Sequence, residues 1–152
     1  MLTAYDAPTA AIVDEAGIDA VLVGDSMGNA ALGYDSTLPV TFAEVASRTA
    51  AVARATEDAL VVADMPFLSF GVDEAESVRN AGRLLKEANA DAVKIESGAH
   101  TVEMTRRMTD VGIPVMAHLG LTPQHVNRLG GYTRQGTDRD AAEEIIDLAG
   151  AH

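Results

Sequence analysis

The sequence predicts an α/β protein with a parallel sheet built from repeated strand–helix units. Short apolar runs recur along the 152 residues, and stretches with helical periodicity lie between them. The runs do not alternate apolar and polar residues, which is typical of strands that are covered on both faces. This rhythm fits an open doubly wound sheet and a closed (βα)8 barrel equally well.

Five strands are expected, each from one short apolar run. The runs are residues 2–5, 20–23, 60–63, 92–95 and 113–117. A complete (βα)8 barrel takes about 250 residues. If the fold is a barrel, we therefore expect residues 1–152 to be one partial catalytic domain that holds about the first five βα units, with the C-terminal units missing.

Helices are expected after the strands, at residues 8–16, 41–55, 73–88, 101–110 and 141–149. In the first of them, Ile12, Val13 and Ala16 have the spacing of one helix face. The third opens with Asp73 and, three residues later, Glu76, an arrangement that resembles a capping box. These signals support a regular alternation of strands and helices.

The composition excludes several classes of partner. The chain carries 23 Asp and Glu against 11 Lys and Arg, a formal net charge of −12. We expect no nucleic-acid partner, because phosphate backbones are bound by clusters of basic residues. No apolar run reaches the roughly 18 residues of a membrane span, so no membrane partner is expected. Without cysteine there are no disulfides, and a cytoplasmic location fits best.

Acidic residues stand at the ends of three expected strands. They are Asp25, Asp64 and Glu96. Because the carboxyl ends of parallel strands share one edge, we expect these carboxylates to converge there. Crowded carboxylates repel one another unless a cation joins them, and oxygen ligands favour Mg²⁺. The sequence thus predicts a divalent metal site, although each acid alone could be a helix N-cap or a turn residue.

Other polar residues are expected at the same edge. Lys94 lies two residues before Glu96, on the same strand face, and could neutralise the carboxylates or bind the carboxylate of an anionic substrate. Ser26 could offer its hydroxyl to the same anion or be an ordinary turn serine. His118 ends the fifth strand and by itself is weak evidence. The other three histidines lack the spacing of a zinc site, so no chemistry is assigned to them.

Taken together, four stretches resemble the ketopantoate hydroxymethyltransferase family. They are residues 2–6 (LTAYD); 23–28 (VGDSMG) continuing to 33–40 (GYDSTLPV); 63–67 (ADMPF) with 93–96 (VKIE); and 118–124 (HLGLTPQ) followed by 130–132 (GGY). Their order and spacing match the family across nearly the whole chain. The GDS and DSTLPV pieces together are highly specific.

The resemblance implies a (βα)8 barrel that binds Mg²⁺. Its implied reaction transfers a hydroxymethyl group from 5,10-methylenetetrahydrofolate to 3-methyl-2-oxobutanoate, forming 2-dehydropantoate in pantothenate biosynthesis through an enolate that the cation stabilises. The implied metal ligands are Asp25, Asp64 and Glu96, the last directly or through a water. The expected substrate contacts are Asp25, Ser26, Asp64, Lys94 and His118.

The resemblance also sets expectations for what lies outside this chain. In the family the general base is a glutamate on a later strand, and no residue here matches it. We therefore expect this chain alone to be inactive. When full length, the family assembles as a homodecamer.

Two other functions stay open. A Mg²⁺-dependent lyase or mutase of the phosphoenolpyruvate mutase and isocitrate lyase kind is similar in residues 3–6 (TAYD) and in its acids, but such enzymes lack the 35–40 and 118–124 stretches in this form. The chain could also be a non-catalytic fragment or a metal- and anion-binding subunit. Half a barrel would leave strand edges unpaired, and such edges favour association.

Overall fold

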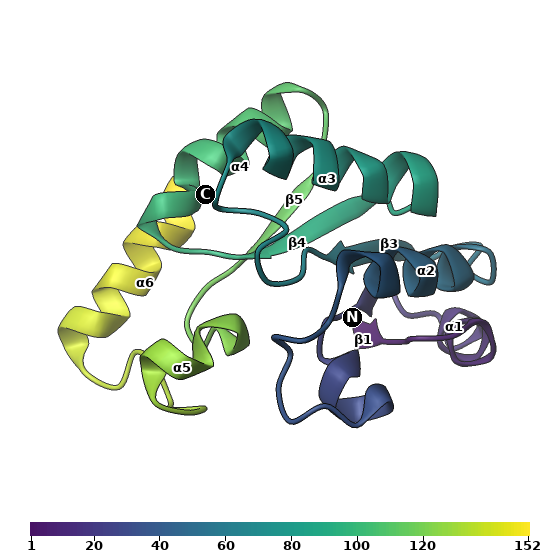
Figure 1. Cartoon of the computed structure of the whole chain (residues 1–152), viewed down its shortest axis with the longest axis horizontal. Helices are drawn as coiled ribbons and strands as arrows, with labels where there is room; N and C mark the ends of the chain where they lie inside the picture. The colour runs from purple at the N-terminus through teal and green to yellow at the C-terminus, as the bar shows by residue number, and fades with distance from the viewer.

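A parallel five-stranded sheet forms the centre of the computed structural model, which describes all of residues 1–152 (Figure 1). The strands are β1 (Leu2–Thr3), β2 (Ala20–Val23), β3 (Leu60–Asp64), β4 (Ala92–Glu96) and β5 (Val115–His118). They lie side by side in chain order, and every neighbouring pair is parallel. The predicted α/β class with a parallel sheet is therefore confirmed.

A helix follows each strand. The helices are α1 (Ala7–Glu15), α2 (Phe42–Ala53), α3 (Glu74–Ala88), α4 (Val102–Asp110) and α6 (Arg139–Ala151). Short helical turns were not predicted; they are η1 (Gly28–Leu32), η2 (Ala99–Thr101), η3 (Pro123–His125) and α5 (Val126–Leu129). Consecutive helices from α1 to α4 pack against one another along the sheet (Figure 1). None of the helices combines the length and the apolar character needed to cross a lipid bilayer.

Side-chain caps fix where four of the helices begin, α2 and α3 among them. The Asp73 carboxylate accepts a hydrogen bond from the backbone N–H of Glu76 at 2.7 Å, so the predicted start of α3 is confirmed. At α2, Thr41 Oγ1 accepts from the Glu44 backbone N–H at 3.2 Å, and the Glu44 carboxylate accepts from the Thr41 backbone N–H at 2.7 Å. This reciprocal pair is a complete capping box.

The predicted apolar face of the first helix is wrong. Ile12 is 69% exposed and Ala16 is also exposed, Val13 is half-buried, and Ala10 is the residue that is fully buried. The reason is the position of α1 at the β1 end of the sheet, where it packs against β2 and has α2 on one side. Its outer face therefore stays in contact with solvent.

Two strand boundaries also differ from the prediction. The first run was predicted to be extended over residues 2–5, but β1 ends at Thr3. The fifth was expected at residues 113–117, whereas β5 begins at Val115. Ile113 is nevertheless buried, at 7% exposure, because it packs in the apolar core before the strand begins.

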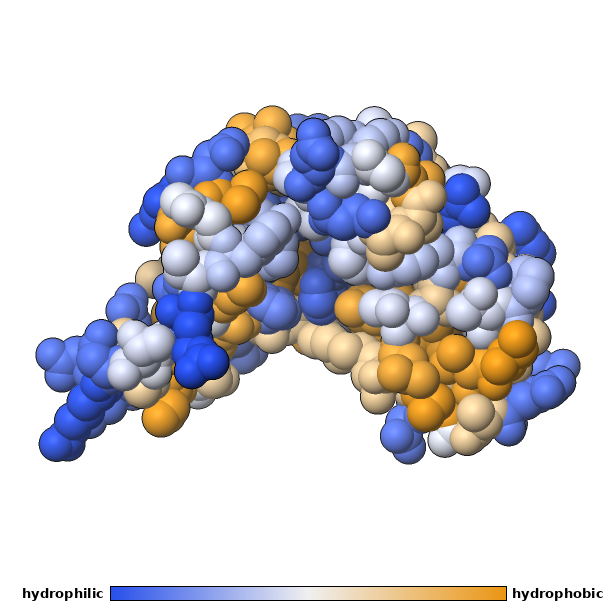
Figure 2. Space-filling view, turned by 90° about the horizontal axis from the view of Figure 1, so that it is seen from below, coloured by the Kyte–Doolittle hydropathy of each residue, from blue (hydrophilic) through white to orange (hydrophobic).

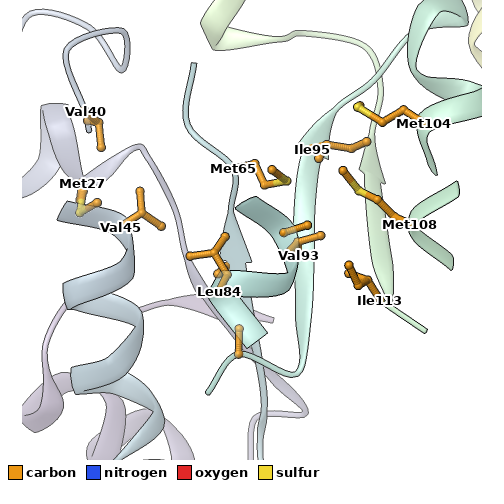
Figure 3. Packing of buried hydrophobic residues seen from close by; sticks show 13 residues of the cluster. Met27, Val40, Val45, Met65, Leu84, Val93, Ile95, Met104, Met108 and Ile113 are labelled. Atoms are coloured by element: carbon orange, nitrogen blue, oxygen red, sulfur yellow. The ribbon is translucent and has the colours of Figure 1, made fainter. Parts of the chain in front are cut away.

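The largest apolar cluster lies between the sheet and helices α2 to α4 (Figure 3). Its labelled members in the figure are Met27, Val40, Val45, Met65, Leu84, Val93, Ile95, Met104, Met108 and Ile113. Met27 lies four residues after the end of β2, Met65 comes directly after β3, and both are fully buried. The core therefore holds in place the loops at the carboxyl ends of these strands.

The opposite face of the sheet carries a smaller cluster. It consists of Leu22, Val62 and Ala92, with Met116 packed against it. Side chains alternate along a strand, so further along β3 and β4 the same face carries the polar residues predicted for the site. Seen from below, the molecule is hollowed, and hydrophilic side chains are visible inside the hollow (Figure 2).

Candidate active site

The three acids expected at the sheet edge lie there and are buried. Asp64 and Glu96 are the last residues of β3 and β4, and Asp25 lies two residues after β2. Their exposures are 5% for Asp25, 3% for Asp64 and 4% for Glu96. In the register of the sheet, Asp64 is paired with Lys94 and Glu96 with His118. The expected convergence on one edge is therefore observed.

Asp64 is held by contacts from both neighbouring strands. The backbone N–H of Asp25 donates to Asp64 Oδ2 at 3.0 Å. Lys94 Nζ forms an ion pair with Asp64 Oδ1, and the Lys94 side chain is only 12% exposed. A Cβ at Gly24 would lie 2.7 Å from Ser26 Oγ and 3.2 Å from Asp64 Oδ2. A side chain at position 24 would therefore displace the Ser26 hydroxyl and crowd the Asp64 carboxylate.

Gln124, which is not among the predicted site residues, connects the other two acids, Asp25 and Glu96. Its backbone N–H donates to both carboxylate oxygens of Glu96, at 3.1 and 3.0 Å. Its side-chain Nε2 donates to Asp25 Oδ2 at 2.8 Å and to the carbonyl of Met65 at 2.9 Å. Gln124 is an uncharged residue placed 99 positions after Asp25. Apart from its place in a motif, nothing in the sequence indicates this contact.

Ser26 and His118 lie at the same edge and are half-buried. Ser26 Oγ shares a hydrogen bond of 3.0 Å with Tyr5 Oη, which reaches it from the segment after β1. His118 Nε2 lies 2.7 Å from the carbonyl oxygen of Leu121. Since a carbonyl only accepts, this nitrogen carries the proton.

Two of the three acids at the site have raised pKa values. Burial raises the pKa of Asp25 to about 6, with the neighbouring Asp64 adding to the rise, while Gln124 and Lys94 oppose it. Burial likewise raises the pKa of Glu96 to about 7, against the backbone hydrogen bond from Gln124. Such shifts are common where a protein prepares a functional site.

His125, which was given no chemistry, lies close to one of the acids. Its Nδ1 is 3.7 Å from Glu96 Oε2. Burial lowers the pKa of His125. The ring is therefore mostly neutral near pH 7 and compensates little of the Glu96 charge.

The acids of the site supply the oxygen donors that Mg²⁺ prefers. No three His, Cys, Asp or Glu side chains are arranged so that together they could hold an ion. Asp25 and Asp64 are in contact, whereas Glu96 is connected to Asp25 through Gln124. Mg²⁺ usually takes one or two protein carboxylates and keeps several waters. Asp25 and Asp64 supply two carboxylates from neighbouring segments of the sheet edge, which matches that number.

Solved structures with a similar fold belong to enzymes of other activities. Phosphoenolpyruvate phosphomutase from Streptomyces platensis aligns with a TM-score of 0.60 at 19% identity, covering 76% of this chain and 47% of that one. 2,3-Dimethylmalate lyase, a PEP mutase/isocitrate lyase superfamily member, aligns with a TM-score of 0.55 at 15% identity, covering 76% and 45%. These similarities show the fold alone.

Sequence relatives are much closer. Curated proteins named 3-methyl-2-oxobutanoate hydroxymethyltransferase are 74% identical in Halobacterium salinarum and 68% identical in Haloarcula marismortui, each over all 152 residues of this chain. The match covers 56% of each relative, so the chain spans about half their length. The family model of ketopantoate hydroxymethyltransferase matches residues 1–152. The resemblance found in the sequence is thereby confirmed, and the chain belongs to the ketopantoate hydroxymethyltransferase family.

Proposed function

We propose that this chain is part of an enzyme that transfers a hydroxymethyl group from 5,10-methylenetetrahydrofolate to 3-methyl-2-oxobutanoate, forming 2-dehydropantoate. Family membership and the names of the relatives support this activity. The structural observation that carries the proposal is the buried contact between Asp25 and Asp64 beside Lys94, at the carboxyl edge of the sheet. This arrangement suits a cation and a small anionic acid.

We propose that the sheet is the first part of a (βα)8 barrel. A doubly wound sheet reverses its strand order at a switch point, whereas these strands follow the chain from β1 to β5 without reversal. Packing of α1, α2, α3 and α4 in sequence supports the same arrangement. The barrel would place Asp64, Lys94 and Glu96 on its inner face, at the end where such barrels hold their active sites.

Asp25 and Asp64 would hold Mg²⁺, with Glu96 acting through a water. When bound, the ion would stabilise the negative charge that develops on the keto oxygen of the oxo acid. Lys94, largely buried beside Asp64, would balance the charge that the substrate carboxylate adds. Ser26, whose hydroxyl is fixed by Tyr5, would donate to that carboxylate, and His118 would contact the substrate from β5.

The residues of this chain would bind and orient the oxo acid without completing the reaction. Removal of the C3 proton needs a general base, which in this family is a glutamate on a later strand. We therefore propose that the chain alone binds ligands but does not turn over. From the resemblance, we also propose a homodecamer and a cytoplasmic location for the full-length protein.

The test is calorimetric titration of the chain with Mg²⁺ and then with 3-methyl-2-oxobutanoate. We expect the oxo acid to bind with Mg²⁺ present and not with a chelator, and we expect Asp64→Asn to abolish binding. Asp91→Asn is the matched control, because Asp91 lies at the opposite end of β4, outside the site. Binding that is indifferent to Mg²⁺ or to Asp64→Asn would contradict the proposal.

A second measurement addresses the reaction. We expect a longer protein that includes the later strands to exchange the C3 proton of the oxo acid with deuterated water in the presence of Mg²⁺, as followed by NMR. The chain of 152 residues should not catalyse this exchange. Cleavage of a 2-methylisocitrate-like acid by the longer protein would instead favour the lyase alternative.

A further inference from the structure

A buried hydroxyl without a partner lies beside the site. Thr37 is 3% exposed, and its Oγ1 makes no hydrogen bond. Its stretch, residues 33–40, contributes to the family resemblance but has no role in the site described above. Buried polar groups are nearly always hydrogen-bonded, because a missing bond is unfavourable. The chain has one other such hydroxyl, that of Thr49 in α2.

The backbone around Thr37 is packed against the turn that follows Asp25. A Cβ at Gly28, three residues after Asp25, would lie 2.8 Å from Val40 Cγ2 and 3.1 Å from the carbonyl oxygen of Ser36. Val40 is part of the apolar cluster in Figure 3, and its backbone N–H donates to the Thr37 carbonyl at 3.1 Å. The segment that carries Thr37 is therefore held in place on this turn.

Asp25 has few donors for a carboxylate in its surroundings. Gln124 Nε2 donates to Oδ2 at 2.8 Å, and no other side-chain hydrogen bond reaches Asp25. Thr37 belongs to the segment that packs on the turn after Asp25, and its hydroxyl makes no hydrogen bond. The same hydroxyl is among the groups that counteract the effect of burial on the pKa of Asp25.

We propose that Thr37 is a positioning residue for Asp25, whose hydroxyl donates to the Asp25 carboxylate when that carboxylate binds its ligand. The inference rests on the proposed function, in which Asp25 holds Mg²⁺. Together with Gln124, Thr37 would fix the carboxylate in one orientation, and a fixed ligand loses less freedom on binding. In the liganded site the Thr37 hydroxyl would then have a hydrogen-bond acceptor.

The test compares Mg²⁺ affinity among matched variants by calorimetry. Thr37→Val keeps the shape and removes the hydroxyl, Thr37→Ser keeps the hydroxyl, and Thr49→Val removes the other unpartnered hydroxyl away from the site. We expect Thr37→Val to weaken Mg²⁺ binding by about tenfold or more, as for a lost hydrogen bond to a charged group. Thr37→Ser and Thr49→Val should bind like the wild type.

Thermal unfolding in a chelator gives the second readout. Neither valine variant should lower the midpoint, because each removes a buried hydroxyl that has no partner. Thr37→Ala is the second hydroxyl-free variant should valine disturb the fold. The role of Thr37 would be overturned if the hydroxyl-free variants bound Mg²⁺ like the wild type, or if Thr37→Ser bound it as weakly as they do. Either result would leave the proposed function standing. A wild type that binds no Mg²⁺ would overturn both.

Discussion

Carboxylates at the two edges of the sheet have opposite surroundings. At the amino-terminal edge, the Asp14 carboxylate of α1 accepts hydrogen bonds from the backbone N–H groups of Glu57 and Ala59, both at 2.8 Å. These bonds, the one from Glu57 foremost, lower the pKa of Asp14. Asp91, just before β4, accepts from the Val61 backbone N–H at 2.8 Å. Acids at this edge connect neighbouring segments of the backbone.

At the carboxyl-terminal edge the same residue types are buried and short of positive partners. Asp25 and Glu96 have raised pKa values, with burial as the main cause in both. Lys94 is the one Lys or Arg side chain that forms an ion pair with these three acids, and its partner is Asp64. The comparison teaches that acids at one edge stabilise the fold through backbone hydrogen bonds, whereas burial at the other edge disfavours the ionised carboxylates, which a bound cation would favour.

The largest expected difference is in pH dependence. Asp25 titrates at about 6 and Glu96 at about 7 in the folded chain, against ordinary values of 3.8 and 4.5. The folded state thus holds protons that the unfolded state has lost, so the free energy of unfolding falls as pH rises from about 4, near the ordinary values, to about 7, where Glu96 ionises in the folded chain. We expect a fall of the order of several kcal/mol in metal-free protein, measured by urea denaturation across this interval.

Two controls connect this pH profile to the site. Glu96→Gln should remove the upper part of the fall, because it removes the group that titrates near pH 7. Saturating Mg²⁺ should flatten the profile, since a bound cation favours the ionised carboxylates. A metal-free profile that is flat, or that rises over this interval, would contradict the raised pKa values.

The next effect concerns the donor that holds the buried acids together. Gln124→Leu keeps a side chain of similar size but removes the hydrogen bonds to Asp25 Oδ2 and to the Met65 carbonyl. We expect the free energy of unfolding to fall by about 2 kcal/mol, because two buried acceptors lose their donor. Gln135→Leu is the control in the same segment, since that side chain bonds only within an exposed turn to Thr133. Gln135→Leu should change the free energy of unfolding by no more than about 0.5 kcal/mol. If both variants lowered it equally, the buried amide of Gln124 would contribute no more to stability than a surface amide.

Much of the fold could be predicted from the sequence because short apolar runs mark the segments that are buried in the sheet. The limits of β2 were predicted as observed, and β3 and β4 extend one residue further, to Asp64 and Glu96. Ile113 shows where this signal fails: it is buried like a strand residue, yet β5 begins only at Val115. Ile12 shows the converse, since an apolar residue at helical spacing stays exposed when no neighbouring element covers it.

The site could be predicted in part, for a topological reason. Parallel strands bring their carboxyl ends to one edge, so the acids at those ends could be placed from the sequence. The connection through Gln124 could not, because an uncharged side chain on a distant loop has no periodicity or charge that marks it. The same holds for Tyr5, whose contact with Ser26 depends on the neighbouring arrangement of β1 and β2.

A smaller effect is expected from Asp14 at the amino-terminal edge. Asp14→Ala removes the acceptor for the backbone N–H groups of Glu57 and Ala59, which lead into β3. The midpoint of thermal unfolding should fall by a few degrees at neutral pH, as for the loss of a helix cap. Asp58→Ala is the control, because it removes a charge from the same loop without removing that acceptor. No difference between the two variants would show that charge, and not hydrogen bonding, is the contribution of Asp14.

The smallest effect is expected at Asp91, where a carbonyl oxygen should serve as well as a carboxylate. Asp91→Asn keeps an acceptor for the Val61 backbone N–H, so the free energy of unfolding should change by less than about 0.5 kcal/mol. At Asp64 the same chemical change also keeps an acceptor for the Asp25 N–H, but it removes the charge that pairs with Lys94. Mg²⁺ binding, measured by calorimetry, should therefore be lost in Asp64→Asn and unchanged in Asp91→Asn. If both variants bound Mg²⁺ like the wild type, charge would matter at neither edge, and the contrast between the two edges would be limited to hydrogen bonding.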